Sequence, residues 1–255
     1  MSTPSSSRGR PTALGKMVAV VEALAEQRRT SEIARMTGLP VSTVHRILQE
    51  LVSVGWARED GDRGYLLGAR VLTLAARDTD HVALTSLARP HLQELSDTTG
   101  SAVHFGVRSG DEAVYVDKLE GSRAYRMRSR IGLPIPLTST AIGKAVLAAL
   151  PEPEVRMIVA RAGLPARTPH SLTTVEALLA DLAGVRERGY SLDEEENELQ
   201  ISCVGAAVYD HKQVPIGGIS LTMLSFEMTP ERTHSVVPLV MRTAAAITKA
   251  LGGRD

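Results

Sequence analysis

Apolar positions in the first part of the chain recur with a helical period. Residues 13–27 carry apolar side chains three or four positions apart, at Leu14, Met17, Val18, Val21 and Leu24. This spacing predicts an amphipathic helix. The stretch SEIARMTG predicts a second, short helix that Thr30 or Ser31 caps and that Gly38 ends.

A third helix and a hairpin follow these two helices. The helix is expected to run from about Pro40 to Val54, and two strand-like runs, GWARED and RGYLLG, come after it. The turn residues Asp60, Gly61 and Asp62 separate the runs, which predicts a tight hairpin. Helix, helix, turn, helix and hairpin is the order of elements in a winged helix-turn-helix.

The hydrophobic period changes after residue 100. Alternating patterns predict strands at 101–108, 112–120 and 124–130, and three further strand-like runs lie near 189–194, 201–209 and 214–224. Helical patterns occupy about 140–150, 152–162, 173–188 and 229–251. Pro238 is expected to kink the last helix. Together these segments predict an α+β domain around a mostly antiparallel central sheet.

The two patterned regions are joined by a segment that is helical in pattern from Ala69 to about Asp97, with a polar break near 78–81. We therefore expect a linker between two domains. The predicted segments are a disordered arm over 1–12, a winged helix-turn-helix domain over 13–68, a linker helix over 69–82 and the sheet-containing domain over 83–255.

Composition excludes several classes of protein. Apolar residues make up 43% of the chain and charged residues 23%, as in ordinary globular domains. No apolar run approaches the ~18–20 residues of a membrane-spanning helix, and the first residues lack the apolar stretch of a secretory signal. The single cysteine, Cys203, excludes an internal disulfide and a cysteine-rich zinc module. We expect a cytoplasmic protein without a membrane partner.

The net charge of zero conceals an asymmetry. Residues 1–77 carry a net charge of +4 and residues 78–255 a net charge of −4. A basic N-terminal part favours nucleic acid as its partner, although ordinary scatter in composition is the alternative. The RGRP stretch at 8–11 is compatible with an arm in the minor groove of DNA or with a solubilising tail.

The second and third helices carry a candidate DNA-reading face. Ala34 supplies the small residue where two crossing helices touch, and Gly38 supplies a positive-φ residue at the turn. An apolar stripe then predicts the buried side of the third helix, at Val44, Ile47, Leu48 and Leu51. The opposite side carries the residues predicted to contact DNA, Ser42, Thr43, His45 and Arg46. Use of these helices for protein contacts alone is the alternative.

A candidate ligand-binding segment is IGLPIPLTSTAIGKAVLAAL, residues 131–150. Pro134 and Pro136 are expected to stop a strand, and a helix follows whose free amides suit a carboxylate or phosphate. Gly143 and Lys144 do not form a phosphate-binding P-loop, because Ala145 stands where that motif needs Ser or Thr. A helix that is merely capped is the alternative.

Two further stretches contain polar residues beside predicted strands. The acidic run 193–196 is open to interpretation as a metal site or paired catalytic carboxylates. We favour a solvated acidic turn with only Asp193 directed inward. Cys203 is expected to behave as a small buried apolar residue, and Ser220 and Thr222 lie two apart on one strand, so their hydroxyls face the same way.

At these residues the chain resembles the IclR family of bacterial transcriptional regulators. The resemblance rests on EIARMTGLPVSTVHRILQEL, PLTSTAIGKAVLA and GYSLDEEE…CVGAAVYD, in this order, and covers about residues 13 to 251. It implies a winged helix-turn-helix joined to a GAF-like effector-binding domain. It also implies a homodimer or dimer of dimers that binds double-stranded operator DNA, expected to be an inverted repeat, and responds to a small organic effector.

The resemblance also implies a set of effector-binding residues. The backbone at the positions of Ala141 and Ile142 would hold the effector's carboxylate, and the other matching residues would line the pocket. The matching residues are Met127, Ile135, Ala141, Ile142, Asp193, Cys203, Ser220 and Thr222. The bulk of Ile142 favours a short aliphatic acid over a bulky aromatic one.

We therefore expect a transcriptional regulator without a catalytic residue, metal or cofactor. Whether the protein acts as a repressor or an activator stays open. The alternatives are an enzyme that uses the pocket and a DNA-binding protein that responds to no ligand. Thiol redox chemistry would need a second cysteine, and a hydrolase would need a base beside a nucleophile; the sequence supplies neither pattern.

Overall fold

The computed structural model describes residues 12–77, 79–122 and 129–253. The chain divides into two units, with the division between Thr79 and Asp80. The predicted arm over 1–12 therefore lies outside the described residues, apart from Thr12. Thr12 caps the first helix by accepting a hydrogen bond from the amide of Gly15, at 3.1 Å.

The first unit contains the predicted helices and hairpin. Its elements are α1 (Ala13–Leu24), α2 (Thr30–Thr37), α3 (Val41–Ser53), β1 (Ala57–Glu59), β2 (Tyr65–Leu67) and α4 (Ala69–Arg77). Three helices meet in one small core, where Val20, Ile33 and Val44 are fully buried. Ala34 is also buried, and Gly38 has the left-handed backbone, φ 68°, that the turn before α3 requires.

Two local expectations for this unit were wrong. Arg29, rather than Thr30 or Ser31, is the N-cap of α2, because the Arg29 carbonyl already accepts hydrogen bonds from two amides of the first helical turn. The hairpin is also less tight than predicted, since five residues, 60–64, connect β1 and β2. Its second strand is fastened to the α1–α2 loop, where the Tyr65 amide donates to the Arg28 carbonyl at 2.8 Å.

Within the described residues, the second unit is built around one antiparallel sheet of six strands in the order β5-β4-β3-β8-β7-β6. The strands are β3 (Ala102–Ser109), β4 (Glu112–Leu119), β5 (Pro134–Pro136), β6 (Ser191–Glu194), β7 (Ile201–Tyr209) and β8 (Pro215–Leu224). Its helices are α5 (Thr79–Thr99), α6 (Ala141–Ala148), α7 (Glu152–Ala162), α8 (Val175–Arg188) and α9 (Pro230–Ala250), with a short 3-10 turn at Ser225–Glu227. The predicted α+β class is confirmed.

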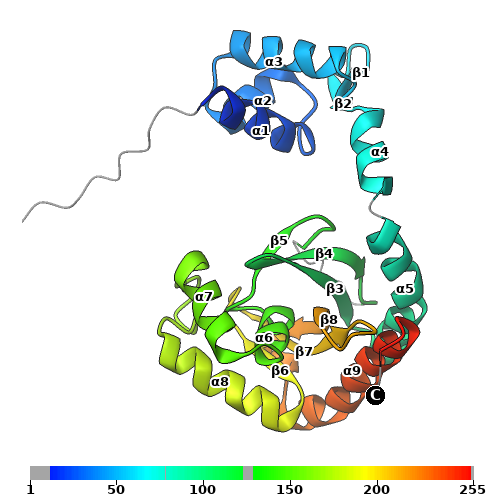
Figure 1. Ribbon diagram of the computed structural model, residues 1–255, viewed down its shortest axis with the longest axis vertical. Helices are drawn as coiled ribbons and strands as arrows, with labels where there is room; N and C mark the ends of the chain where they lie inside the picture. The colour runs from blue at the N-terminus through cyan, green and yellow to red at the C-terminus, as the bar shows by residue number, and fades with distance from the viewer. Residues whose placement is uncertain (1–11, 78, 123–128, 254–255) are drawn as a thin grey trace, which may run out of the picture. The chain divides into compact units, whose positions relative to one another are not determined.

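Helices cover both faces of this sheet (Figure 1). On one face, α5 and α9 pack over a core that includes Leu92, Phe105 and Val240. On the other face, α6, α7 and α8 pack over a second core that includes Ile142 and Leu182. The sheet therefore separates the helix that continues from the linker region, α5, from the helix with the candidate anion-binding amides, α6.

One strand prediction was wrong, and another cannot be compared with the structure. Pro134 and Pro136 do not stop a strand; they form β5, an edge strand that pairs with β4 and places Ile135 opposite Ala113. An edge strand tolerates proline because one row of its backbone groups needs no sheet partner. The strand expected over 124–130 falls mostly on 123–128, which lie outside the described residues.

The sequence also excluded membrane-spanning segments. Within the described ranges, none of the helices has the length and apolar character needed to cross a bilayer.

Candidate functional site

The four residues predicted to contact DNA share the outward side of α3. Ser42, His45 and Arg46 are exposed and Thr43 is half-buried, whereas Val44 and Leu48 on the opposite side are fully buried. None of the four side chains has a hydrogen-bond partner among the described residues. We call these four residues the α3 face; their side chains are available to a partner.

The hairpin of β1 and β2, which we call the wing, is hydrogen-bonded to α3 one helical turn after Arg46. Gln49 Nε2 donates to Glu59 Oε1 at 3.0 Å and to the Tyr65 hydroxyl at 2.9 Å. These bonds connect α3 to both strands of the hairpin. The wing and the α3 face are therefore held in one fixed arrangement within the first unit.

A cavity of about 390 Å³ lies between the sheet and α6 in the second unit. We call it the sheet cavity. Seven of the eight residues predicted to bind the effector line it, namely Ile135, Ala141, Ile142, Asp193, Cys203, Ser220 and Thr222. Met127, the eighth, lies outside the described residues.

The N-terminus of α6 contributes backbone amides to the sheet cavity. Thr140 is the N-cap; its hydroxyl accepts from the Gly143 amide at 3.0 Å and donates to the Pro136 carbonyl at 2.7 Å. The amides of Ala141 and Ile142 have no acceptor among the described residues. Because the N-terminus of a helix carries partial positive charge, these two amides form an acceptor site for an anionic group.

The opposite wall consists of polar side chains on three neighbouring strands. Cys203 on β7 pairs in register with both Asp193 on β6 and Thr222 on β8. Its sulfur lies 3.2 Å from Thr222 Oγ1. Ser220 as a residue is 4% exposed, and its hydroxyl has no partner among the described residues. A buried hydroxyl that faces a cavity without a partner is a group that a ligand can satisfy.

A buried histidine that the sequence reasoning missed contacts two residues of the cavity lining. His104 on β3 is 1% exposed and lies opposite Ser220 in the sheet. Its Nδ1 lies 3.4 Å from Thr222 Oγ1, and its Nε2 lies 2.7 Å from Ser129 Oγ. The alternation in SAVHFGVR could have indicated that this side chain faces the cavity side, because Phe105 beside it packs in the core on the other face.

Burial controls the protonation states around the cavity. Burial, aided by the positive charge of Lys118, lowers the pKa of His104 to about 3, so the ring is neutral. Burial raises the pKa of the Cys203 thiol well above its usual range, so it stays protonated. Burial and then the Glu196 carboxylate raise the pKa of Asp193 to about 7, against the opposing effects of two backbone hydrogen bonds and Lys144.

The acidic run 193–196 is not the solvated turn that we predicted. Asp193 is directed inward, as expected, but Glu196 is also buried, at 6% exposure. It forms an ion pair with Lys144 of α6, which is 1% exposed and also lies 2.9 Å from Asp181 Oδ2. A buried ammonium group needs such counter-charges. Glu196 therefore neutralises Lys144 of α6 and does not face solvent.

Other residues that line the sheet cavity were not among the predicted effector-binding residues. They are Tyr115, Ser129, Leu133, Pro134, Pro136, Thr140, Arg167, Asn197, Glu198 and Ile201. Most of them come from loops, where no periodic pattern indicates which side chains point inward. Arg167 and Asn197 are in contact, since Arg167 Nε donates to the Asn197 carbonyl at 3.3 Å.

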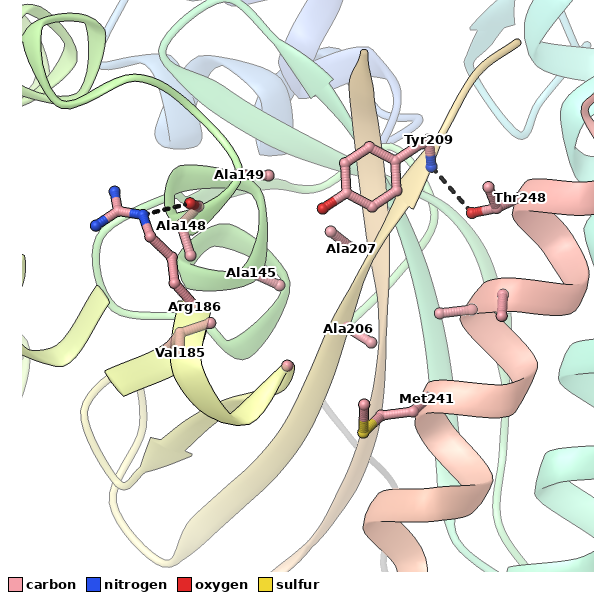
Figure 2. Close-up of a pocket in the computed structure, with 13 residues that line it drawn as sticks. Ala145, Ala148, Ala149, Val185, Arg186, Ala206, Ala207, Tyr209, Met241 and Thr248 are labelled. Carbon is pink, nitrogen blue, oxygen red and sulfur yellow. Dashed lines mark hydrogen bonds between the residues drawn. The ribbon is translucent and has the colours of Figure 1, made fainter. Parts of the chain in front are cut away.

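A second cavity in this unit, of about 370 Å³, contains none of the predicted site residues. It lies between α6, α8, β7 and α9, and Figure 2 shows that alanines form much of its wall. Two polar groups there are already used within the chain: Arg186 Nε donates to the Ala148 carbonyl and the Tyr209 amide donates to Thr248 Oγ1. Its chemistry offers less to a polar ligand than that of the sheet cavity.

The described ranges also contain no group of three or more His, Cys, Asp or Glu side chains that could hold a metal ion. Buried Asp193 and Glu196 are occupied by backbone amides and a lysine, respectively: Asp193 Oδ1 accepts from the amides of Glu196 and Asn197, at 2.9 and 3.3 Å. The buried carboxylates of the acidic turn thus accept hydrogen bonds from its own loop and from α6.

Comparison with known proteins identifies both units. The family model for the IclR helix-turn-helix domain matches residues 13–61, and the model for the C-terminal part of bacterial transcriptional regulator IclR matches residues 76–249. The HTH-type transcriptional regulator KdgR of Escherichia coli is 33% identical over 243 residues, which are 94% of this chain and 92% of that protein. The transcriptional repressor IclR of Escherichia coli is 31% identical over 251 residues, 96% of this chain and 92% of that protein.

Solved structures agree with this assignment. The crystal structure of IclR from Thermotoga maritima superposes with a TM-score of 0.76 at 30% identity, covering 94% of this chain and 98% of that one. An IclR homologue from Microbacterium hydrocarbonoxydans, crystallised with 4-hydroxybenzoate, gives a TM-score of 0.78 at 25% identity and covers 94% of this chain and 99% of that one. The chain therefore belongs to the IclR family of bacterial transcriptional regulators, with a DNA-binding helix-turn-helix domain and an effector-binding C-terminal domain.

Proposed function

We propose that this regulator binds an inverted-repeat operator as a homodimer or dimer of dimers and that a small carboxylate in the sheet cavity modulates that binding. The observation that carries the ligand class is the convergence of two free α6 amides, those of Ala141 and Ile142, with a buried, unpartnered Ser220 hydroxyl on one cavity. Amides of this kind suit an anionic group, and the hydroxyl supplies a neutral hydrogen bond.

The α3 face is the proposed DNA-reading surface. Ser42, Thr43 and His45 are positioned to meet phosphates or base edges, and Arg46 can donate two parallel hydrogen bonds to guanine O6 and N7. Their exposure and lack of partners within the chain support this role. The wing bonds of Gln49 support it further, because a recognition helix must be held rigidly to read bases.

A groove on the first unit supports self-association. It has a volume of about 570 Å³ and is lined mostly by apolar side chains, namely Met17, Val18, Val21, Glu22, Leu51, Val54, Trp56 and Arg70. We call it the α1 groove. Val18 is 44% exposed and Val54 51%, which exposes apolar surface of the kind that a partner covers. A second copy is the proposed occupant, since one recognition helix reads only a few base pairs and two-fold pairing doubles the site.

The ligand proposal also draws on one relative. The IclR homologue crystallised with 4-hydroxybenzoate binds a carboxylic acid, which supports the same class of ligand for this chain. The bulk of Ile142, beside the free amides of the sheet cavity, favours a shorter, aliphatic acid here.

The chemistry of the cavity favours binding over catalysis. Because burial raises the pKa of the Cys203 thiol, the nucleophilic thiolate is disfavoured. The neutral His104 contacts Thr222 and Ser129 rather than the cysteine. Cys203 thus lines the cavity as a neutral thiol, and His104 contacts two lining residues without lining the cavity itself.

One pair of experiments tests the proposal. Sequencing the DNA that the purified protein selects from a random pool should reveal an inverted repeat. Calorimetric titration of short aliphatic acids should then find ligands whose binding weakens by about 0.5–1.5 kcal/mol in Ser220→Ala, one neutral hydrogen bond. Ser109→Ala, which changes an exposed serine at the end of β3, is the matched control. A single unpaired half-site, or ligand binding indifferent to both Ser220→Ala and Asp193→Asn, would contradict the proposal.

A further inference from the structure

We propose that Arg167 is a second anion-binding group of the sheet cavity, so that the effector carries two acidic groups rather than one. The inference rests on the proposed function, because it takes the α6 amides as the site of the first acidic group. Arg167 lines the same cavity as those amides, but it comes from the loop between α7 and α8. A ligand that spans the cavity can therefore reach both.

The guanidinium group of Arg167 has unused donors. Its Nε donates to the Asn197 carbonyl at 3.3 Å, and its remaining N–H groups have no acceptor among the described residues. Several exposed or half-buried arginines of this unit pair with carboxylates, among them Arg89, Arg108, Arg156, Arg161 and Arg188. Arg167 lies beside the acidic loop and forms no such pair. Its free edge has the planar geometry that binds carboxylate or phosphate with two hydrogen bonds.

The loop that carries Arg167 is fastened in place. Thr168 Oγ1 donates to the Glu195 carbonyl at 2.7 Å, and Ser171 Oγ donates to the Glu196 carbonyl, also at 2.7 Å. Ser171 Oγ in turn accepts from the amides of Arg167 and Thr168, at 3.0 and 2.9 Å. The backbone of Arg167 is therefore fixed to the same loop that positions Asp193.

The loop between β6 and β7, which contains Glu196, is also bonded to α6. Glu196 forms its buried ion pair with Lys144 on α6, the helix whose first amides face the cavity. The proposed anion sites thus belong to one connected framework: α6, the loop 195–200 between β6 and β7, and the loop that carries Arg167. Arg167 is exposed, but its fixed backbone and the Nε bond to Asn197 leave it less conformational entropy to lose on binding than an arginine on a mobile loop would have.

The test compares acids that differ only in their second acidic group. The probes are the dicarboxylates from malonate to adipate, their monoamides, and 3-phosphoglycerate with glycerate; each is titrated by calorimetry into the full-length protein. At least one diacid is expected to bind roughly tenfold to one-hundredfold more tightly than its matched monoacid, the value of a charge-assisted hydrogen bond. Tighter binding of a dicarboxylate than of its monoamide identifies the second acidic group of the effector as a carboxylate. Tighter binding of 3-phosphoglycerate than of glycerate identifies it as a phosphate.

Two variants make the result specific to Arg167. Arg167→Gln should remove most of the preference and leave binding of the monoacid within about twofold. Arg156→Gln, which changes an exposed arginine of α7 outside the cavity, should keep the preference. Equal binding of diacid and monoacid to the wild type, or a preference that survives Arg167→Gln, overturns the inference while leaving the proposed function intact. If neither series binds, the carboxylate proposal fails and this inference fails with it.

Discussion

Asp193 and Cys203 face each other in register across β6 and β7, and both are buried. The pairing brings a carboxyl group and a protonated thiol onto one wall of the sheet cavity. Asp193 Oδ1 accepts two backbone hydrogen bonds, and burial nevertheless raises the pKa of its carboxyl to about 7. The charge of this wall therefore changes near neutral pH.

Asp193 should make the stability of the protein depend on pH. The native carboxyl has a pKa of about 7 against a reference value of 3.8, so between these values the native state binds more protons than the unfolded state. The contribution to stability is consequently full below about pH 4 and falls as the pH rises toward 7. Asp193→Asn cannot ionise and keeps an oxygen for the two amides. It should be more stable than the wild type at pH 8, by on the order of 1–3 kcal/mol.

Thermal unfolding of both proteins from pH 5 to pH 8 measures this effect. The difference in Tm between Asp193→Asn and the wild type should widen as the pH rises. Glu194→Gln, which neutralises the exposed neighbouring carboxylate, should show no such trend. A constant difference between Asp193→Asn and the wild type across this range would show that Asp193 stays ionised in the native protein.

Gly143 fixes the contact between α6 and the segment before it. A Cβ atom at this position would lie 2.3 Å from Leu137 Cα and 2.4 Å from the Leu137 carbonyl oxygen, and backbone cannot yield as a flexible side chain can. We expect Gly143→Ala to destabilise the protein by about 1–3 kcal/mol, which lowers Tm by several degrees. It should also weaken ligand binding, because the amides of Ala141 and Ile142 begin this helix.

Gly184→Ala is the matched control for Gly143→Ala. It lies within α8, where the nearest atom to the new Cβ is the terminal nitrogen of Arg188, at 3.2 Å. Alanine is a better helix former than glycine by roughly 0.5–1 kcal/mol, so this variant should keep or raise Tm. A Gly143→Ala protein as stable as the wild type would mean that α6 can shift away from Leu137 without loss.

The features that local sequence determines were predictable. The winged helix-turn-helix follows from helical periodicity and from Gly38, whose positive φ could be anticipated from its place between two helices. The strands β7 and β8 follow from apolar, strand-like runs, and the two-residue spacing of Ser220 and Thr222 placed their hydroxyls on one face. These patterns need no knowledge of distant contacts, because the chain's own period determines which side is buried.

The features that depend on long-range contacts could not be predicted in this way. Glu196 is buried because Lys144, 52 residues earlier in the chain, needs a counter-charge, and a run of acidic residues gives no sign of that partner. Arg167 lies at the sheet cavity because its loop is hydrogen-bonded to the loop 195–200 between β6 and β7. The edge strand β5 was hidden by its two prolines, which usually end strands.

We expect two copies of the protein to associate through the α1 groove. Val18→Glu would place a charge on this apolar surface, so the association that covers it should be lost. Because a dimer would become a monomer and a dimer of dimers would become a dimer, the mass measured by light scattering at micromolar protein should halve in either case. Val41→Glu changes a valine that is 55% exposed and lies outside the groove, and it should leave the mass unchanged. An unaltered mass for Val18→Glu would place the interface elsewhere.

Arg46 provides the sharpest test of the α3 face. It is exposed, has no partner among the described residues and lies one helical turn before Gln49, which the wing holds in place. Arg46→Ala should weaken operator binding by roughly 1–3 kcal/mol per half-site and relax the preference at one base pair in each half-site. Arg46→Lys keeps the positive charge but loses the planar fork, so it should retain the affinity for non-specific DNA while losing that base preference. Fluorescence anisotropy at one fixed salt concentration, on the selected operator and on its single-base variants, measures both effects. If the affinity falls equally for every sequence, Arg46 contacts a phosphate, and if it does not fall at all, α3 presents a different residue to the bases.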